Sequence, residues 1–587
     1  MDQKLLAVAG GKEPADLVVK NGKIVNVFSG EIYDGGVAVA GDKIAAVGDV
    51  DYTIGEGTKI LDAQGKYLTP GFIDGHIHPE SSNLAIRSFA EAVLKHGTTV
   101  IMTDLHEIGV VGGLEAIEAV LKEAEATDLK LYFIVPSHVP FSPNLETSGG
   151  RFDTEIIKRA LERPDAVGLS ECVGMYLAAG FPELMASCDA ALAKGKSLQG
   201  HLPDADAATL NTCVAAGVST DHESLSGKDV VDRLRAGCSV MLREGSSARS
   251  LTQLLEPVLA DHLDTSNLSI VTDDLHTIDL ATTGHLDESV RTALKAGVEF
   301  LTAIQMVTIN AARAFQLDRF VGCLAPGRRA DINLTTGPED FRVDTVVAGG
   351  RVVAQGGESV VHYPVVEHNP ILLNTVHLKR CVEAADFQIR VSESARAVKV
   401  KVMDTLPWIP ITQPRDVELN VVDGVVQCDL DQDVLYIAQV ERHGKTGGIG
   451  KAFMGGFKLK KGAIASSMGH DNHNIIVMGA NHADMAAAVN RVAALQGGQV
   501  FVVDGEVLCE IPFPVCGLQS DLSAEELAEE KRKFNATLRE HGCEISYTCM
   551  FLSFICLAAI PLYAITDKGF IDVFQQKVID PILEVLE

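Results

Sequence analysis

Residues 71–78 read GFIDGHIH, an apolar, β-rich run that ends in two histidines separated by one residue. Seven further runs of this kind follow: TTVIMTDL (98–105), KLYFIVPS (130–137), AVGLSECV (166–173), SLQGHLPD (197–204), VSTDHES (218–224), SVMLREGS (239–246) and LSIVTDDL (268–275). Helical patterns such as GGLEAIEAVLKEAEA separate most of them. Strands that alternate with helices indicate βαβ units and a parallel sheet. Eight such units in about 245 residues predict an α/β protein with a (β/α)8 barrel of the TIM type.

The competing interpretation of this alternation is an open, doubly wound sheet. Such a sheet commonly carries a glycine-rich dinucleotide fingerprint directly after its first strand. No such fingerprint follows residues 71–78. We therefore expect a closed catalytic barrel over residues 72–315.

Short strand-like segments flank the barrel region on both sides. Residues 1–71 alternate apolar and polar side chains around Asn-Gly and Gly-Asp pairs, which is typical of a small β-sheet. A similar texture returns at 316–365, so we expect the two pieces to pair into one composite β-sandwich. Residues 366–587 mix strand-like runs with a helical segment and predict a C-terminal α/β domain. A chain of 587 residues is too long for a single hydrophobic core, so a division into several domains is expected.

Composition narrows the class of partner. The formal charge of −29 argues against nucleic acids and anionic membranes, because both require a basic surface. A neutral or cationic small molecule fits better. The 12 cysteines are scattered without a CxxC pair, and no secretory signal pattern follows Met1. We therefore expect reduced thiols and a cytoplasmic location.

One segment has the length of a membrane span. Residues 545–566 form a stretch of 22 residues without a charged side chain. The stretch contains Pro561 and several hydroxyl groups, has no lysine-rich flank and follows the charged run EELAEEKRKF. We expect buried core here rather than a membrane helix.

Histidines and acidic residues fall where almost every predicted barrel strand ends. His76 and His78 are two residues apart, so in an extended strand both imidazoles point to the same face. The ends of the other strands add Glu171, His201, His222 and Asp273. In a barrel these positions converge at one mouth. A single histidine of this kind is more often a hydrogen-bonded core residue. Four histidines and two carboxylates together indicate a site for divalent Zn, Mn or Fe, in which Glu171 can bridge two ions.

Longer stretches of sequence carry a family resemblance. LTPGFIDGHIHPESS (68–82) and TINAARAFQLDRFVGCLAPGRRADINL (308–334) resemble the amidohydrolase superfamily. Within it, the chain is similar over essentially its whole length to the adenine deaminase family. The stretches that match include SECVG, GHLPD, MLREGSS, TDDLHTIDL and, near the C-terminus, SSMGHDNHNIIVMGAN.

The resemblance implies a function as well as a fold. It implies a metal-dependent hydrolase that converts the purine base adenine to hypoxanthine and ammonia, as in purine salvage. It also implies two divalent metal ions, Mn or Fe rather than Zn, and a homo-oligomer such as a dimer. Many amidohydrolases bridge their metals with a carboxylated lysine on strand four, whereas adenine deaminases resemble this chain in using a glutamate, here Glu171.

Roles for individual residues follow from the resemblance and the chemistry. We expect the metal ligands to be His76, His78, Glu171, His201, His222 and Asp273, with Asp273 and Glu171 as catalytic residues. Asp273 would carry the proton. We expect Asp273 rather than Asp274 to face the pocket, because successive residues of a strand alternate faces.

Two further groups of polar residues each have two possible roles. His106, Glu107, Arg243 and Glu244 are candidate substrate contacts, and the alternative is that they pair with one another or anchor loops. His470, Asp471 and His473 suggest a further metal site, but polar residues in a turn more often bind backbone groups. A lid or partner for the barrel mouth is the favoured role of that segment.

Three competing functions can be compared with the sequence. Deaminases with an HxE and PCxxC signature are excluded, because no PCxxC follows His78-Pro79-Glu80. A related amidohydrolase could act on another 6-substituted purine or, like hydantoinases and dihydroorotases, on a cyclic amide, but the latter predicts a lysine at Glu171. A catalytically silent scaffold predicts lost ligands, whereas all six positions are occupied.

Overall fold

The structure is a computed structural model that describes residues 1–364, 367–406, 409–558 and 562–587. Its centre is an eight-stranded parallel sheet whose neighbours follow in chain order. The strands are β6 (Phe72–Asp74), β7 (Thr98–Thr103), β8 (Lys130–Pro136), β9 (Ala166–Val173), β10 (Ser197–His201), β11 (Val218–Asp221), β12 (Ser239–Arg243) and β13 (Leu268–Val271). All eight predicted runs are strands in the predicted order, so the barrel is confirmed.

The barrel closes between its last and first strands. The Asp273 amide donates to the His76 carbonyl at 3.0 Å, and the His78 amide donates to the Asp273 carbonyl at 3.2 Å. Below this bridge, the Thr272 hydroxyl donates to Asp74 at 2.6 Å. β6 and β13 end before these residues, so the predicted strands were too long at this point. Three predicted metal ligands therefore lie in the loops that close the barrel.

Helices surround the barrel. Those between and after the strands are α2 (Ile86–Leu94), α3 (His106–Ala124), α4 (Thr154–Ala160), α5 (Gly174–Ala178), α6 (Pro182–Leu192), α7 (Ala207–Ala215), α8 (Gly227–Arg235), α9 (Leu251–Ala260), α10 (Thr277–Thr282), α11 (Leu286–Lys295), α12 (Phe300–Met306) and α13 (Ile309–Ala314). Several begin at a side-chain cap, such as Asp153 before α4 and Asp206 before α7. Their apolar faces, for example Val230 and Leu254, are buried in the main core.

The two flanking segments form one nine-stranded sheet. Its strands are β1 (Leu17–Asn26), β2 (Glu31–Ala40), β3 (Lys43–Gly48), β4 (Lys59–Asp62) and β5 (Tyr67–Pro70) from the N-terminal side, with β14 (Ile332–Thr335), β15 (Val343–Ala348), β16 (Arg351–Gln355) and β17 (Glu358–Ser359). Antiparallel pairing of β5 with β14 joins the halves. Val37 and Val39 point into a shared core, while Ala38 packs under α1 (Gln3–Ala9). The two flanks therefore pair with each other as expected, and they do so within one continuous sheet.

The C-terminal part is built on a ten-stranded sheet. It comprises β18 (Ala397–Leu406), β19 (Ile409–Val422), β20 (Val425–Val426), β21 (Leu435–Val440), β22 (Ile449–Gly455), β23 (Ala463–Ser466), β24 (Ile475–Gly479), β25 (Gly498–Val503), β26 (Glu506–Pro512) and β30 (Ile582–Leu586). The strands β27 (Tyr563–Thr566), β28 (Gly569–Asp572) and β29 (Lys577–Ile579) form a small separate sheet. The helices are α14 (His482–Ala494), α15 (Ala524–Glu540) and α16 (Thr548–Phe554). The predicted α/β character is confirmed.

The uncharged stretch 545–566 is divided between α16 and β27. Cys549, Leu552 and Ile555 are buried, which confirms the core prediction for the described part of the stretch. Residues 559–561 lie outside the described residues. Among the described helices, none combines the length and apolar character that crossing a membrane requires.

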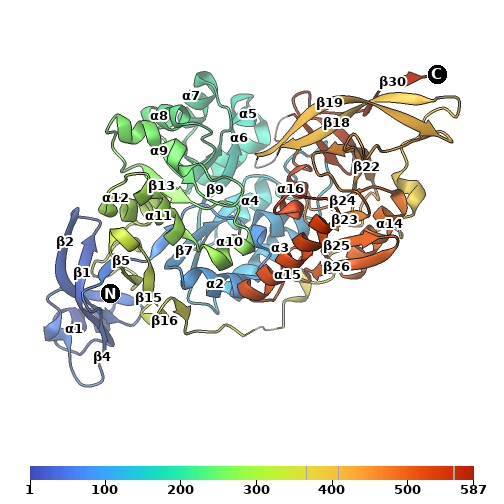
Figure 1. The fold of residues 1–587 in the computed structure, drawn as a ribbon. Helices are drawn as coiled ribbons and strands as arrows, with labels where there is room; N and C mark the ends of the chain where they lie inside the picture. The colour runs from blue at the N-terminus through green and yellow to red at the C-terminus, as the bar shows by residue number, and fades with distance from the viewer. Residues whose placement is uncertain (365–366, 407–408, 559–561) are drawn as a thin grey trace.

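Figure 1 shows the N-terminal sheet, the barrel and the C-terminal part in sequence across the molecule. Polar contacts join the barrel to the C-terminal part: the buried Lys531 ammonium donates to Asn83 at 2.7 Å, and His368 lies between Glu123, at 3.1 Å, and Asp521, at 2.8 Å.

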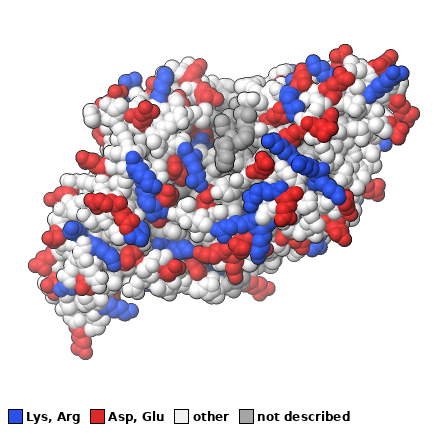
Figure 2. Space-filling view, viewed as in Figure 1, with Lys and Arg blue, Asp and Glu red and all other residues white. Residues whose placement is uncertain are grey.

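On the face in Figure 2, acidic and basic side chains are interspersed. We propose domain boundaries after residues 71, 315 and 365.

Candidate metal centre

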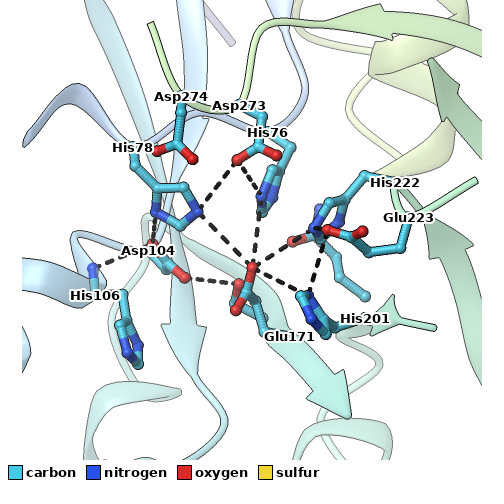
Figure 3. A network of polar contacts seen from close by, with 12 residues as sticks. His76, His78, Asp104, His106, Glu171, His201, His222, Glu223, Asp273 and Asp274 are labelled. Carbon is cyan, nitrogen blue, oxygen red and sulfur yellow. Dashed lines mark hydrogen bonds and ion pairs between the residues drawn. The ribbon is translucent and has the colours of Figure 1, made fainter. Parts of the chain in front are cut away.

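Glu171 is the centre of the polar cluster in the barrel mouth (Figure 3). Its Oε1 lies 3.7 Å from His76 Nε2, 3.8 Å from His78 Nε2, 3.7 Å from His201 Nδ1 and 3.6 Å from His222 Nε2. Asp273 Oδ1 lies 3.6 Å from both His76 Nε2 and His78 Nε2. The structure therefore brings together all six residues that the sequence suggested as ligands.

These separations suit metal ligation better than hydrogen bonding. Distances of 3.6–3.8 Å exceed those of N–H···O hydrogen bonds. Donor atoms about 2.1 Å from one tetrahedral ion lie about 3.4 Å apart, which is close to what the cluster shows. Among the described residues, the buried His76 Nε2 and His201 Nδ1 have no hydrogen-bond partner. Since unpartnered buried nitrogens are costly, the donor set fits divalent metal ions.

A bulge in β9 directs Glu171 into the mouth. Leu169 pairs with Leu198, and Cys172 with Gly200, so β9 has one extra residue between the two pairs. Glu171 adopts a left-handed backbone with φ of 47°, which is uncommon for a residue other than glycine. Bulges near active sites redirect side chains in this way. A sequence pattern with a period of two does not reveal such a bulge.

Neighbouring acids orient the ligands. Asp104 Oδ1 lies 3.1 Å from His78 Nδ1, which leaves His78 Nε2 to face the cluster. Asp104 Oδ2 in turn accepts a hydrogen bond from Ser170 Oγ at 2.8 Å. Such outer partners of ligating histidines fix the imidazole orientation. Asp104 was not among the residues predicted from sequence, although it directly follows β7, as other site residues follow their strands.

Arg243 forms an ion-pair network beside the cluster. Its guanidinium donates to both oxygens of Glu223, at 2.9 and 3.0 Å, and to Asp273 Oδ2 at 3.0 Å. Burial would raise the pKa of Asp273, but His76 and Arg243 hold that pKa well below its usual value. Glu223, whose Oε1 is 3.4 Å from His222 Nε2, was not among the residues predicted from sequence. The available signal was its place directly after Asp221 and His222, at the end of β11.

The reason given for preferring Asp273 over Asp274 was wrong. Asp273 has a left-handed backbone, with φ of 58°, so the alternation of an extended strand does not apply. Both carboxylates line the cavity in the barrel mouth. Their partners still differ: Asp273 faces the histidines and Arg243, whereas Asp274 accepts a hydrogen bond from Ser81. Burial and the neighbouring Asp273 raise the pKa of Asp274 to about 6.

Three of the four candidate substrate contacts line the same cavity. They are His106, Glu107 and Arg243. Glu107 contacts His470 Nδ1 at 3.1 Å through one oxygen and His473 Nε2 through the other. Glu244 is not among the residues that line the cavity and accepts a hydrogen bond from the Leu251 amide at 3.0 Å at the start of α9, which favours its alternative role as a loop anchor.

The C-terminal part completes this cavity. Its volume is about 300 Å³, and residues from both the barrel and the C-terminal part line it. Those from the C-terminal part are His470, Asp471, Phe554 and Leu557. The GHDNHN segment is therefore a partner of the barrel mouth. Glu107, His470 and His473 also form a group with metal-ligand chemistry, but one nitrogen of each imidazole, His470 Nδ1 and His473 Nε2, faces a Glu107 oxygen directly, as in a hydrogen-bonded pair.

Comparison with known proteins gives two matches to family models. The amidohydrolase family model matches residues 67–353, which include the barrel and its nearest flanks. The model of the adenine deaminase C-terminal domain matches residues 410–577. The two matches follow one another along the chain without overlap.

Individual relatives match over nearly the whole length. Adenine deaminase of Moorella thermoacetica is 39% identical, with 98% of this chain and 97% of the relative covered. Adenine deaminase of Clostridium botulinum is 36% identical, with 97% and 96% covered. Among solved structures, a crystal structure described as that of an adenine deaminase aligns with a TM-score of 0.45 and 18% identity, over 58% of this chain and all of that chain (100%).

Proposed function

The chain belongs to the adenine deaminase family, and from this premise we propose that it hydrolyses adenine to hypoxanthine and ammonia at the barrel mouth. One observation carries the assignment to this site: four imidazole nitrogens lie within 3.6–3.8 Å of a single oxygen of Glu171. That arrangement supports a metal-dependent hydrolase, and the cavity of about 300 Å³ suits a small-molecule base.

We propose that two divalent ions, Mn or Fe rather than Zn, bind in this cluster. The ligands would be His76, His78, Glu171, His201, His222 and Asp273, with Glu171 as the bridge. When bound, such ions lower the pKa of water toward neutrality and so make it a better nucleophile.

The protein side chains would carry the proton transfers. Water adds to C6 of adenine, the C6–N6 bond breaks and ammonia leaves, so a proton must move from the water to the departing amine. Asp273 is placed for this task because its carboxylate lies beside the ligand histidines at the cavity and can accept and return a proton. Arg243 would position Asp273 through the 3.0 Å hydrogen bond to Oδ2.

Product analysis tests the proposed function. The purified protein, supplied with Mn²⁺ or Fe²⁺, is assayed for ammonia and hypoxanthine on adenine, other 6-substituted purines and cyclic amides, with metal content measured alongside. We expect equal amounts of hypoxanthine and ammonia from adenine, and loss of both after chelation. Hydrolysis of a cyclic amide without any turnover of adenine would refute it.

The alternatives have less support. A cyclic-amide hydrolase of the hydantoinase or dihydroorotase type predicts a lysine in place of Glu171 on β9. A catalytically silent scaffold has no need for six converging ligands. We further propose a homodimer in the cytoplasm, which size measurement and fractionation of cells would check.

A further inference from the structure

The C-terminal part contributes two polar side chains to the cavity, His470 and Asp471, and the proposed chemistry uses neither. Asp471, in the segment GHDNHN at residues 469–474, is the more exposed of the two. Its side chain is 14% exposed, in contrast to 4% for the adjacent His470. The exposed part of Asp471 therefore faces a cavity that also contains the proposed metal ligands.

The other polar side chains of this segment have partners within the protein. His470 and His473 contact Glu107. Asn472 accepts a hydrogen bond from Gln439 at 2.8 Å. Asn474 in turn donates a hydrogen bond through Nδ2 to the Thr147 carbonyl at 2.8 Å. Asp471 has a longer contact: in the described part of the chain its nearest ion-pair partner is His470 Nδ1, at 3.5 Å, and that nitrogen lies closer to Glu107, at 3.1 Å.

The same contrast holds among the carboxylates that line the cavity. Glu171 and Asp273 face the histidines, Glu223 is held by Arg243, Asp274 by Ser81, and Glu107 by His470 and His473. Asp204 lies on the exposed rim, where water can solvate it. Among the described carboxylates that line this cavity, Asp471 is thus the largely buried one whose nearest donor, His470 Nδ1 at 3.5 Å, lies beyond ordinary hydrogen-bond distance. A carboxylate in such a place is stabilised by a donor from the ligand.

Its neighbours hold Asp471 in place. The His470 ring stacks on Phe554 with centroids 4.9 Å apart and an interplanar angle of 10°. Contact with Glu107 joins that ring to the barrel. The backbone is fixed as well, because the His473 amide donates to the Gly469 carbonyl at 2.6 Å. The carboxylate is therefore presented to the cavity from a rigid segment, as specific recognition requires.

We propose that Asp471 accepts the imidazole N–H of the free purine base and selects the base against purines substituted at that ring nitrogen, such as nucleosides. This inference rests on the proposed function and names its recognition group. A free purine carries one N–H on its five-membered ring, at N9 or N7, and substitution there removes the donor. Carboxylates make strong, charge-assisted hydrogen bonds to such donors. The loss of one costs about 10-fold to 100-fold in affinity.

The test is calorimetric binding of the product to the metal-loaded protein, which needs no turnover. Wild type should bind hypoxanthine at least about 10-fold more tightly than 9-methylhypoxanthine. 8-Methylhypoxanthine, which keeps the N–H and adds a methyl group of the same size, reports the steric effect alone. In Asp471→Ala the preference for hypoxanthine over the 9-methyl base should fall below about threefold, while Asp471→Asn, which keeps a neutral acceptor, should be intermediate.

Controls keep the result specific. Asp204→Asn removes a carboxylate from the exposed rim of the same cavity and should keep the wild-type preference. Metal content and circular dichroism verify that each variant is folded and loaded. An equal affinity of wild type for hypoxanthine and 9-methylhypoxanthine, or an unchanged preference in Asp471→Ala, overturns the inference. Absence of adenine turnover in wild type would instead refute the proposed function.

Discussion

Replacing Glu171 with glutamine tests the bridge on which the proposed site depends. The amide keeps the shape of the side chain but removes the charge that faces four imidazole nitrogens at 3.6–3.8 Å. Changing only an outer partner of a ligand typically lowers metal affinity about 10-fold to 100-fold. Loss of a ligand shared by two ions should lower metal affinity at least to the upper end of that range, about 100-fold or 2.8 kcal/mol per ion.

Metal analysis measures this effect directly. Wild type and Glu171→Gln are dialysed against the same buffered concentration of Mn²⁺, and bound metal is determined by mass spectrometry. We expect about two ions per chain for wild type and fewer than one for the variant, with turnover reduced in parallel. Glu244→Gln is the matched control, because Glu244 caps α9 and lies outside the cavity lining.

Unchanged occupancy in Glu171→Gln would refute the reasoning. Glu223 would then be the competing bridge, since its Oε1 lies 3.7 Å from His201 Nδ1 and 3.4 Å from His222 Nε2. In that event Glu223→Gln, rather than Glu171→Gln, would release metal.

Three further predictions concern single side chains. Asp273→Asn should lower kcat about 100-fold or more, as expected for a lost general base, whereas Asp274→Asn should change mainly stability or KM; near-normal turnover of metal-loaded Asp273→Asn would contradict this. Burial lowers the pKa of Lys531 from 10.5 to about 7, so unfolding experiments should show wild type gaining stability relative to Lys531→Met as the pH rises from 7 to 10. Hydrogen bonds to Asp521 and Glu123 raise the pKa of His368 from 6.5 to about 10. The stability of wild type relative to His368→Gln should therefore be greatest below pH 6.5 and fall toward pH 10. For either pH prediction, a stability difference that does not change with pH would contradict it.

Much of this protein could be predicted from local patterns. The eight strands were found in order because each is a short apolar run bounded by turns, and their alternation with helices implies a parallel barrel. The barrel then explains why residues as far apart in sequence as His76 and His222 meet, since the carboxyl ends of its strands share one mouth. Helix and strand patterns likewise predicted the C-terminal α/β character.

Long-range contacts established the rest of the site. Glu171 faces the histidines because of a bulge in β9, and Asp273 because of a left-handed turn beyond β13, and neither feature follows a simple period. The pairing of Arg243 with Glu223 joins two strand ends, and no local rule favours that pairing over the predicted substrate contact.

The part of the cavity that comes from the C-terminal residues was the hardest to predict from local sequence patterns. Asp471 lies 198 positions after Asp273, yet both line one cavity. The sequence could identify GHDNHN as a polar turn, but its contact with Glu107 depends on how the C-terminal part packs against the barrel. Local periodicity records which face of an element is buried, whereas the identity of the surface that buries it is a property of the assembled tertiary structure.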